Sequence, residues 1–339
     1  MALVPPRGKM ARNDQAFVWS AGVRVGGTSL WCDAPRLRDW CFVSRADLKV
    51  VFPNPAGARL IVSQGTCTLR EVARLAQPDD PLTPLDGRPF AIGRLRCELL
   101  PSGYGPGSAQ LIVETKERTV VYAGALNPLV RPTVEPAQVR ACDALAIEAP
   151  LASWLEPLPP REPVEVALLE AVRAALADQA QPVLLVPPLG VAGEVAALLM
   201  DAGVRVRATR TIAAWYALPV TGSGDERHPG ALLVPHASRD APAVKRLARA
   251  RLLYVGEGAL APDAPARLGV HAAFPLSNYG DLPSILAHVV ATGARDVYFT
   301  AGLTDEVASA FAARRLRVHA LAAPAQLALS LQKDYTDGP

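Results

Sequence analysis

A glycine-rich turn is the stretch of this 339-residue sequence that most suggests chemistry, because closely spaced glycines can bring backbone amides against a phosphate. It reads G-Y-G-P-G-S and covers residues 103–108. No lysine follows it, and its spacing differs from that of a phosphate-binding P-loop. The turn therefore predicts a backbone that bends tightly and approaches another segment closely, and it does not indicate a nucleotide site.

Residues that could bind a metal or act as nucleophiles are scattered along the chain. The five cysteines form no C-x-x-C pair, which is typical of buried, reduced thiols and not of a disulfide framework or a zinc knuckle. We expect the five histidines to be ordinary surface or capped side chains. These residues are Cys32, Cys41, Cys67, Cys97, Cys142, His228, His236, His271, His288 and His319.

The glycine-rich turn must be positioned by strands. Residues 111–113 and 119–122 are short apolar runs separated by a polar loop, which predicts a strand, a hairpin turn and a second strand. After the proline-rich stretch 157–163, a plausible domain junction, strands and helices alternate, which favours a parallel α/β layer.

Helix boundaries are also readable. Residues 68–76 and 164–180 predict helices from their composition and periodicity. Asp281 and Pro283 predict the start of a third helix, and Gly293 predicts its end.

The turn and its neighbours resemble the metallo-β-lactamase-fold nucleases, in particular the β-CASP group, with its ligase- and helicase-associated exonucleases and mRNA 3′-end processing factors. P-S-G-Y-G-P-G-S-A-Q, residues 101–110, corresponds to the family's P-A-G-H-x-x-G-S-A-Q. S-R-A-D-L-K-V, residues 44–50, corresponds to S-H-A-H-x-D-H, and residues 277–281 resemble S-D-H-A-D. Residues 142–151 look like the family's buried strand whose end carries an acidic residue, here Glu148, and residues 297–302 resemble its strand followed by T-H-G. The resemblance covers most of the chain, and these five matches follow the family's order.

The resemblance implies an α/β fold, a metallo-β-lactamase-like αββα sandwich of residues 1–155 and 268–339, with a β-CASP-like α/β insertion over residues 156–267. It also implies that the ligands of two metal ions are replaced. The degenerate motif positions hold Arg45, Asp47, Lys49, Val50, Tyr104, Ala125, Tyr279 and Ala301. Guanidinium and ammonium groups carry only donors and repel cations, so we expect no metal, no cofactor and no catalytic residues.

Two arrangements of the replaced residues remain open. Arg45, Lys49, Tyr104 and Tyr279 could bind a phosphate, with arginine as a bidentate partner and the tyrosines stacking or hydrogen-bonding. Alternatively, the tyrosines fill the vacated pocket while the two cations pair with nearby carboxylates. The candidate carboxylates are Asp47, Glu148 and Asp281.

Basic residues supply a second candidate site. Lys245, Arg246, Arg249 and Arg251 fall on one predicted helix, which is typical either of a phosphate-binding groove between domains or of a solvated helix face. The net charge of +3 is too small to indicate a nucleic-acid binder by itself. These four basic residues, and not the net charge, make nucleic acid a candidate ligand of a cleft between the two domains.

Composition sets the class of protein. Apolar residues make up 50% and charged residues 20% of the chain, as in an ordered globular protein. No apolar run reaches the roughly 18 residues that a membrane span needs, and the N-terminus contains no apolar signal core. We expect a cytoplasmic protein that does not enter a membrane.

These observations predict a catalytically inactive pseudo-nuclease. It would act as a non-catalytic subunit or scaffold for a nucleic-acid processing or repair complex, with an active nuclease relative as its protein partner. One alternative is a divergent, metal-independent enzyme that acts on a phosphorylated substrate. Another is a purely structural assembly protein without nucleic acid.

Overall fold

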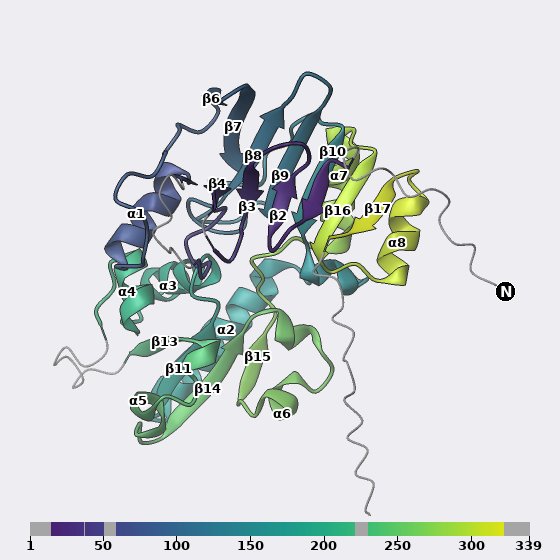
Figure 1. Ribbon diagram of the computed structural model, residues 1–339. Coiled ribbons are helices and arrows are strands. Elements are labelled where there is room, and N and C mark those ends of the chain that lie inside the picture. Colours follow the sequence, from purple (N-terminus) through teal and green to yellow (C-terminus); the bar gives the residue numbers. More distant parts are fainter. Residues whose placement is uncertain (1–14, 37, 51–58, 221–229, 322–339) are drawn as a thin grey trace, which may run out of the picture.

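The computed structural model describes residues 15–36, 38–50, 59–220 and 230–321, and this part of the chain is a mixed α/β structure with three sheets (Figure 1). Two sheets pack on each other in a first unit, and a parallel sheet forms a second unit below them. None of the described helices is long and apolar enough to cross a membrane.

The first sheet has the strand order β1-β2-β3-β4-β5. Its first three strands are antiparallel, and β3, β4 and β5 are parallel. The strands are β1 (Phe17–Trp19), β2 (Val23–Val25), β3 (Leu30–Cys32), β4 (Trp40–Phe42) and β5 (Arg59–Ile61).

The second sheet has the order β17-β16-β10-β9-β8-β7-β6. Its central strands are nearly continuous apolar runs because both of their faces are buried. Phe17 and Phe42 of the first sheet pack with Leu111 and Tyr122 of the second to form the core between them. The strands are β6 (Phe90–Ile92), β7 (Leu95–Pro101), β8 (Ala109–Glu114), β9 (Thr119–Ala125), β10 (Ala144–Glu148), β16 (Asp296–Ala301) and β17 (Arg317–Ala320).

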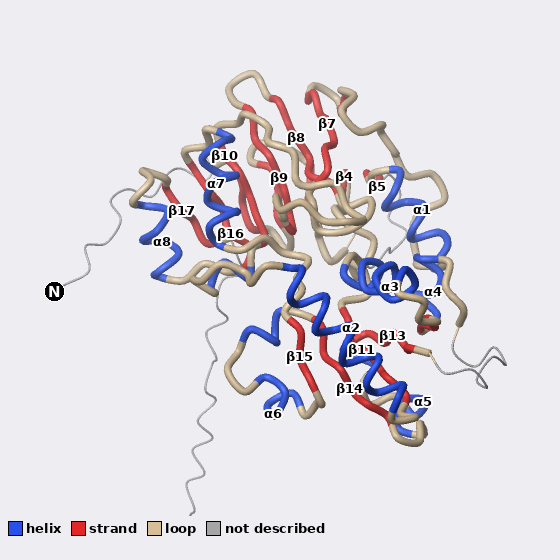
Figure 2. Tube along the Cα trace, turned by 180° about the vertical axis from the view of Figure 1, so that it is seen from behind, coloured by secondary structure: helices blue, strands red, loops and turns tan. Residues whose placement is uncertain are grey.

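Helices cover the outer faces of both sheets. Helix α1 (Gln64–Val72) packs through Cys67 on the outer face of the first sheet. Helices α7 (Leu282–Thr292) and α8 (Asp305–Ala312) pack on the outer face of the second, as Figure 2 shows from behind. The predicted boundaries of α7 are confirmed, because Asp281 accepts a hydrogen bond from the Ser284 amide and Gly293 takes the left-handed conformation.

The second unit is a five-stranded parallel sheet in the order β12-β13-β11-β14-β15. Helices α2, α3 and α4 cover one face and α5 lies on the other. Its elements are α2 (Arg161–Ala177), β11 (Gln181–Val186), α3 (Val191–Asp201), β12 (Val206–Ala208), α4 (Arg210–Tyr216), β13 (Ala231–Pro235), α5 (Pro242–Lys245), β14 (Ala250–Val255), α6 (Ala264–Leu268) and β15 (Ala272–Phe274). Short 3₁₀ helices are η1 (Pro150–Ser153), η2 (His236–Ser238) and η3 (Glu257–Leu260).

Two predicted boundaries differ from those observed. The parallel sheet extends past residue 267 to Phe274, because β15 pairs with β14. The helix predicted over residues 68–76 instead runs from Gln64 to Val72, because the Ser63 hydroxyl caps it by accepting a hydrogen bond from the Thr66 amide.

Candidate functional site at the junction of the two units

Four segments of the first unit bring their polar side chains together on the side that faces the second unit. Arg45 and Asp47 lie in the loop after β4, and Tyr104 lies in the glycine-rich turn between β7 and β8. Glu148 ends β10, and Tyr279 precedes α7. These residues are far apart in the sequence but share hydrogen bonds and ion pairs, and we call them the Arg45 cluster.

Arg45 lies between the two carboxylates of this cluster. Its Nε is 3.1 Å from Asp47 Oδ1, and its Nη1 is 3.2 Å from each carboxylate oxygen of Glu148. The Arg45 side chain is only 11% exposed. Burial alone would lower the pKa of Arg45, but Asp47 and Glu148 outweigh burial and raise it. The guanidinium therefore stays charged and is committed to carboxylates of the chain itself.

The two tyrosines complete the cluster. The Tyr104 hydroxyl donates to Asp47 Oδ2 at 3.3 Å, and the Tyr279 hydroxyl donates to Glu148 Oε1 at 2.6 Å. Their rings meet edge to face with centroids 5.0 Å apart, and the Arg45 guanidinium carbon lies 4.5 Å from the Tyr104 ring centroid. Burial raises the pKa of both phenols, so both remain neutral donors.

The cluster does not fit a divalent metal ion. A cation would have to displace Arg45 from Asp47 and Glu148, and the two phenols and the guanidinium present donors toward the carboxylates. Within the described residues, no group of three or more histidine, cysteine, aspartate or glutamate side chains is placed to hold a metal. The guanidinium and the two phenols instead satisfy both carboxylates from within the chain itself.

Asp33 supports the loop that carries Arg45. Its carboxylate accepts hydrogen bonds from the Ser44 amide at 2.7 Å, the Ser44 hydroxyl at 2.6 Å and the Tyr122 hydroxyl at 2.9 Å. Burial raises the pKa of Asp33, and these three hydrogen bonds oppose that rise. Asp33 therefore acts as a buried anchor of the loop and does not face an open site.

The other motif positions take no part in the cluster's polar contacts. Ala125 is buried beside Tyr104, and Ala301 ends β16 opposite Glu148. Val50 is buried on the outer face of the first sheet, in the cluster that also contains Cys67 of α1. Lys49 is exposed at a cavity of about 360 Å³, so it is not brought to the carboxylates as Arg45 is. Asp281 caps α7 and accepts a hydrogen bond from the Leu158 amide.

Close packing explains the glycines of the turn. A Cβ on Gly107 would lie 2.5 Å from the Gly65 carbonyl carbon, at the start of α1. A Cβ on Gly105 would lie 2.8 Å from Leu189, which follows β11 in the second unit. Gly103 and Gly107 also have positive φ angles of 79° and 71°. The turn touches both units, which is the close approach that its sequence predicted.

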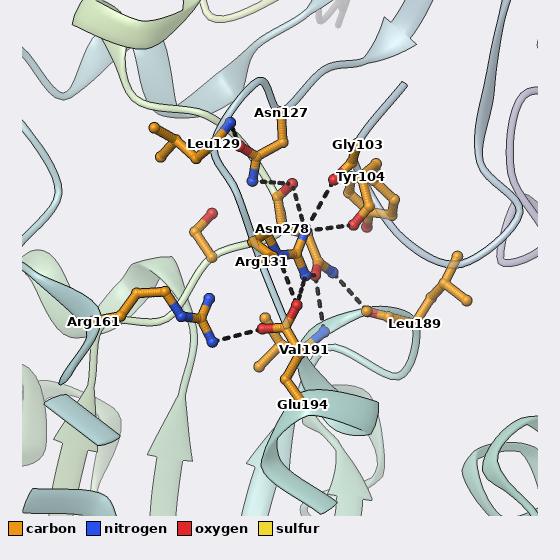
Figure 3. Close-up of polar contacts among 12 residues, drawn as sticks. Gly103, Tyr104, Asn127, Leu129, Arg131, Arg161, Leu189, Val191, Glu194 and Asn278 are labelled. Atoms are coloured by element: carbon orange, nitrogen blue, oxygen red, sulfur yellow. Dashed lines mark hydrogen bonds and ion pairs between the residues drawn. The ribbon is translucent and has the colours of Figure 1, made fainter. Parts of the chain in front are cut away.

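A second buried network, centred on Arg131, joins the units and has no motif in the sequence (Figure 3). Arg131 donates from Nε to Glu194 Oε1 of α3 at 2.7 Å and from Nη2 to Asn278 Oδ1 at 2.8 Å. Its Nη1 donates to the carbonyls of Gly103 and Tyr104 at 3.0 and 2.9 Å. The Arg131 and Glu194 side chains are each 2% exposed.

Asn278 extends this network into the second unit. Its Nδ2 donates to the Leu189 carbonyl at 2.7 Å, and its Oδ1 accepts from the Val191 amide at 2.9 Å (Figure 3). Arg161 of α2 donates to Glu194 Oε2 at 2.7 Å. The turn that carries Tyr104 is thus tied through Arg131 and Asn278 to the start of α3.

The basic residues do not join the Arg45 cluster, and the prediction that they share a helix was wrong. Helix α5 ends at Lys245, Arg246 and Arg249 follow it in a turn, and Arg251 lies in β14. Arg249 directly precedes β14, at the end of the parallel sheet where its strands begin, whereas Leu189 follows the opposite end of β11. The Lys245 ammonium is paired with Asp240 at 3.1 Å on the surface.

Comparison with known proteins gives a similarity of fold alone. No family model matches the sequence, and no curated protein matches it. A crystal structure of a protein of unknown function from Enterococcus faecalis V583 is similar, with a TM-score of 0.51 and 14% sequence identity. The similarity covers 76% of this chain and 74% of that protein. At this identity, what the two proteins share is the fold.

Proposed function

We propose that the chain is a catalytically inactive relative of the metallo-β-lactamase-fold nucleases with a β-CASP-like insertion. The layer order, with two packed sheets between outer helices and a parallel α/β unit inserted after β10, supports this placement. So does the convergence of Arg45, Tyr104 and Tyr279, which were assigned to metal-site motifs from the sequence and meet in one cluster.

The single observation that carries the inactive assignment is the pairing of Arg45 with Asp47 and Glu148. Two-metal hydrolysis needs nitrogen and oxygen ligands around two ions roughly 3.5–4 Å apart, which activate a water and stabilise the leaving group. A buried guanidinium occupies the place between the remaining carboxylates, so the chain's residues do not fit those ions. The chain then serves as a non-catalytic subunit or scaffold whose partner is a protein, for example an active nuclease relative.

The alternatives have less support. An enzyme acting on a phosphorylated substrate would need Arg45 to leave both carboxylates, which would remain buried without their counter-charge. Nucleic acid in the cleft between the units would not reach Lys245, Arg246 or Arg249, which lie at the other end of the parallel sheet. A purely structural assembly protein would differ from the proposed scaffold only in its partner, which would not be part of a nucleic-acid processing complex.

The first test measures metal content and nuclease activity in the same sample. We expect the purified protein, after incubation with manganese or zinc, to retain less than one ion per chain by mass spectrometry and to leave single- and double-stranded DNA and RNA uncut. One or two tightly bound ions per chain together with cleavage would overturn the proposal.

A restoration variant tests the family placement separately. Arg45→His, Asp47→His, Lys49→Asp and Val50→His together rebuild the family's motif S-H-A-H-x-D-H in the loop after β4. If the loop has the family's geometry, the folded variant should bind zinc at least about tenfold more tightly than the wild type, since it gains imidazole and carboxylate ligands. A folded variant with no gain in zinc affinity would argue against the family placement while leaving the inactive assignment intact.

The scaffold role needs a partner with a measurable response. A tagged copy of the chain, cross-linked in its native cells, should recover a protein in a stable ratio. Adding the purified chain to that protein should change its activity or its assembly state. A partner that behaves identically with and without the chain would contradict the role of subunit.

A further inference from the structure

A cavity of about 370 Å³ lies between the units, and Tyr279 of the Arg45 cluster is one of its lining residues. It is lined by Leu151 and Trp154 from the segment after β10, by Glu257 and Leu260 from the segment after β14, and by Tyr279. Both segments follow the carboxyl ends of parallel strands, where ligands of α/β proteins usually bind. We call it the Trp154–Glu257 cavity.

Glu257 is the charged group of this cavity. Its carboxylate is partly buried and accepts a hydrogen bond from the Ser277 hydroxyl at 2.7 Å. Among the described residues it has no ion-pair partner, and no basic side chain from that part of the chain lines the cavity. A partly buried carboxylate that has a neutral hydrogen-bond donor and no cation is stabilised by a cationic ligand.

The backbone that presents Glu257 is held in an unusual conformation. Gly256 has φ 154° and ψ −179°, a region that is essentially restricted to glycine. A Cβ on Gly256 would lie 2.9 Å from the His236 ring, and a Cβ on Gly258 would lie 2.8 Å from the Tyr254 hydroxyl. The rings of His236 and Tyr254 stack with centroids 4.4 Å apart and pack against this loop on either side of Glu257.

Two aromatic side chains give the cavity its preference among cations. Trp154 and Tyr279 are partly buried and line the same space as Glu257, with Leu151 and Leu260 beside them. Aromatic faces attract organic cations with apolar stems, and a strongly hydrated metal ion gains little from apolar walls. The cavity beside Lys49 is lined by Arg70 and Asp47 as well, so it combines two basic groups with one carboxylate and differs in charge from the Trp154–Glu257 cavity.

We propose that the Trp154–Glu257 cavity binds an organic cation, a guanidinium or alkylammonium group of the size of an arginine or lysine side chain. The carboxylate of Glu257 pairs with the charge, and the aromatic rings contact the stem and the cationic head. This site does not depend on whether the Arg45 cluster is catalytically inactive.

The test is a calorimetric titration of the purified full chain with the peptide acetyl-Gly-Gly-Arg-Gly-Gly-amide. The matched ligand contains citrulline, which has nearly the same shape as arginine and no charge. We expect saturable binding of the arginine peptide with a Kd of about 0.1–1 mM, and at least about tenfold weaker binding of the citrulline peptide.

Variants locate the binding. Glu257→Gln keeps the size of the side chain and its contact with Ser277 but removes the charge, and it should weaken binding about tenfold. Trp154→Leu should weaken it several-fold. The control is Glu156→Gln, an equal charge change on an exposed residue two positions from Trp154, which should leave the Kd within about twofold.

Three outcomes would overturn the proposal: no saturable binding up to about 10 mM, equal binding of the citrulline peptide, or unchanged binding by Glu257→Gln. A titration with n-butylguanidinium then identifies the source of the cation. Binding of this free guanidinium as tight as that of the peptide supports a small-molecule site. Binding of the peptide alone supports a basic side chain supplied by a protein partner.

Discussion

At the scale of single residues, the Arg45 cluster is held together by one charge. Arg45 contacts Asp47 and Glu148 through separate nitrogens, and the side chains of the two acids are 18% and 22% exposed. A buried ion pair of this kind contributes little net stability relative to apolar residues, but losing one partner is costly because the other stays buried and charged. The cluster should therefore tolerate replacement as a whole far better than loss of its arginine.

Arg45→Met should destabilise the protein by about 3–5 kcal/mol at pH 7, since both carboxylates lose their counter-charge. Burial raises the pKa of Asp47, and Arg45 opposes that rise, so the variant raises it further. A carboxyl whose pKa is raised by folding binds its proton more tightly in the native state, and stability falls as pH rises above the unfolded value of 3.8. The variant should therefore regain stability between pH 7 and pH 5.

Urea unfolding at the two pH values measures this effect. Arg96→Met is the matched control, because Arg96 pairs with Glu114 but is 62% exposed, and it should cost less than about 1 kcal/mol at either pH. Equal losses for the two variants at pH 7 would contradict the assigned role of Arg45.

The sequence predicted which residues meet in the Arg45 cluster better than it predicted their partners. The motif positions placed Arg45, Tyr104 and Tyr279 near one another, because turn glycines and strand ends are readable from a resemblance. It left the choice between Asp47, Glu148 and Asp281 open, because only the fold shows that Asp47 and Glu148 lie on either side of Arg45 while Asp281 caps α7. The Arg131 network was not predicted, since an isolated arginine and asparagine carry no pattern.

At the scale of elements, local signals bounded α7, missed the Ser63 cap of α1 and failed where the sheet decides the element. Asp281 and Gly293 bound α7 as predicted, because both act within one helical turn. Arg251 was assigned to a helix with Lys245, but it lies in β14, which pairs with β11 along its length. Strand pairing outweighed helix propensity over this stretch, and no local pattern reports the partner strand.

Helix α7 contains a buried histidine, His288, and we expect it to make the stability of the whole protein depend on pH. His288 is 4% exposed, its Nε2 has no hydrogen-bond partner among the described residues, and burial lowers its pKa from 6.5 to about 4. The native state therefore keeps His288 neutral while the unfolded chain takes up a proton below pH 6.5. The neutral, buried His288 therefore favours the native state fully above pH 6.5, and the free energy of unfolding decreases as the pH falls from 6.5 toward 4.

His288→Leu should remove this dependence. Relative to wild type, the leucine variant should gain about 2 kcal/mol of unfolding free energy between pH 7 and pH 4.5, a value that follows from the two pKa values by proton linkage. Denaturant unfolding across this pH range measures the difference. Parallel profiles for the two proteins would show that His288 does not titrate as its burial implies.

At the scale of the whole molecule, the two units are joined by a buried polar contact in addition to apolar packing. Arg131 donates hydrogen bonds to the Tyr104 carbonyl of the glycine-rich turn, to Glu194 of α3 and to Asn278 in the segment between β15 and α7. Trp215 of α4 also donates to the Leu69 carbonyl of α1 at 2.8 Å. The units are therefore expected to unfold as one cooperative body.

Arg131→Met should cost about 3–5 kcal/mol, because it leaves the Oε1 atom of Glu194 and two carbonyls without their donor in a buried place. It should also split thermal unfolding into two transitions, since the units lose their central contact. Differential scanning calorimetry measures both effects. Arg161→Met is the control, because Arg161 also donates to Glu194 but is 28% exposed, and it should shift the single transition by less. A single, unshifted transition for Arg131→Met would contradict the coupling.

The insertion that separates β10 from β16 also has a consequence during synthesis on the ribosome. The two strands are neighbours in the second sheet, yet the Thr300 hydroxyl that bonds the Ile147 carbonyl is 153 residues away in the chain. At about 5–20 residues per second, roughly 10–30 s pass between the emergence of one strand and of its partner. During that interval β10, whose residues 144–147 are all buried in the native state, has one edge open to other nascent chains. High yields of folded protein should therefore depend on chaperones that cover this edge, and slowing translation should increase aggregation.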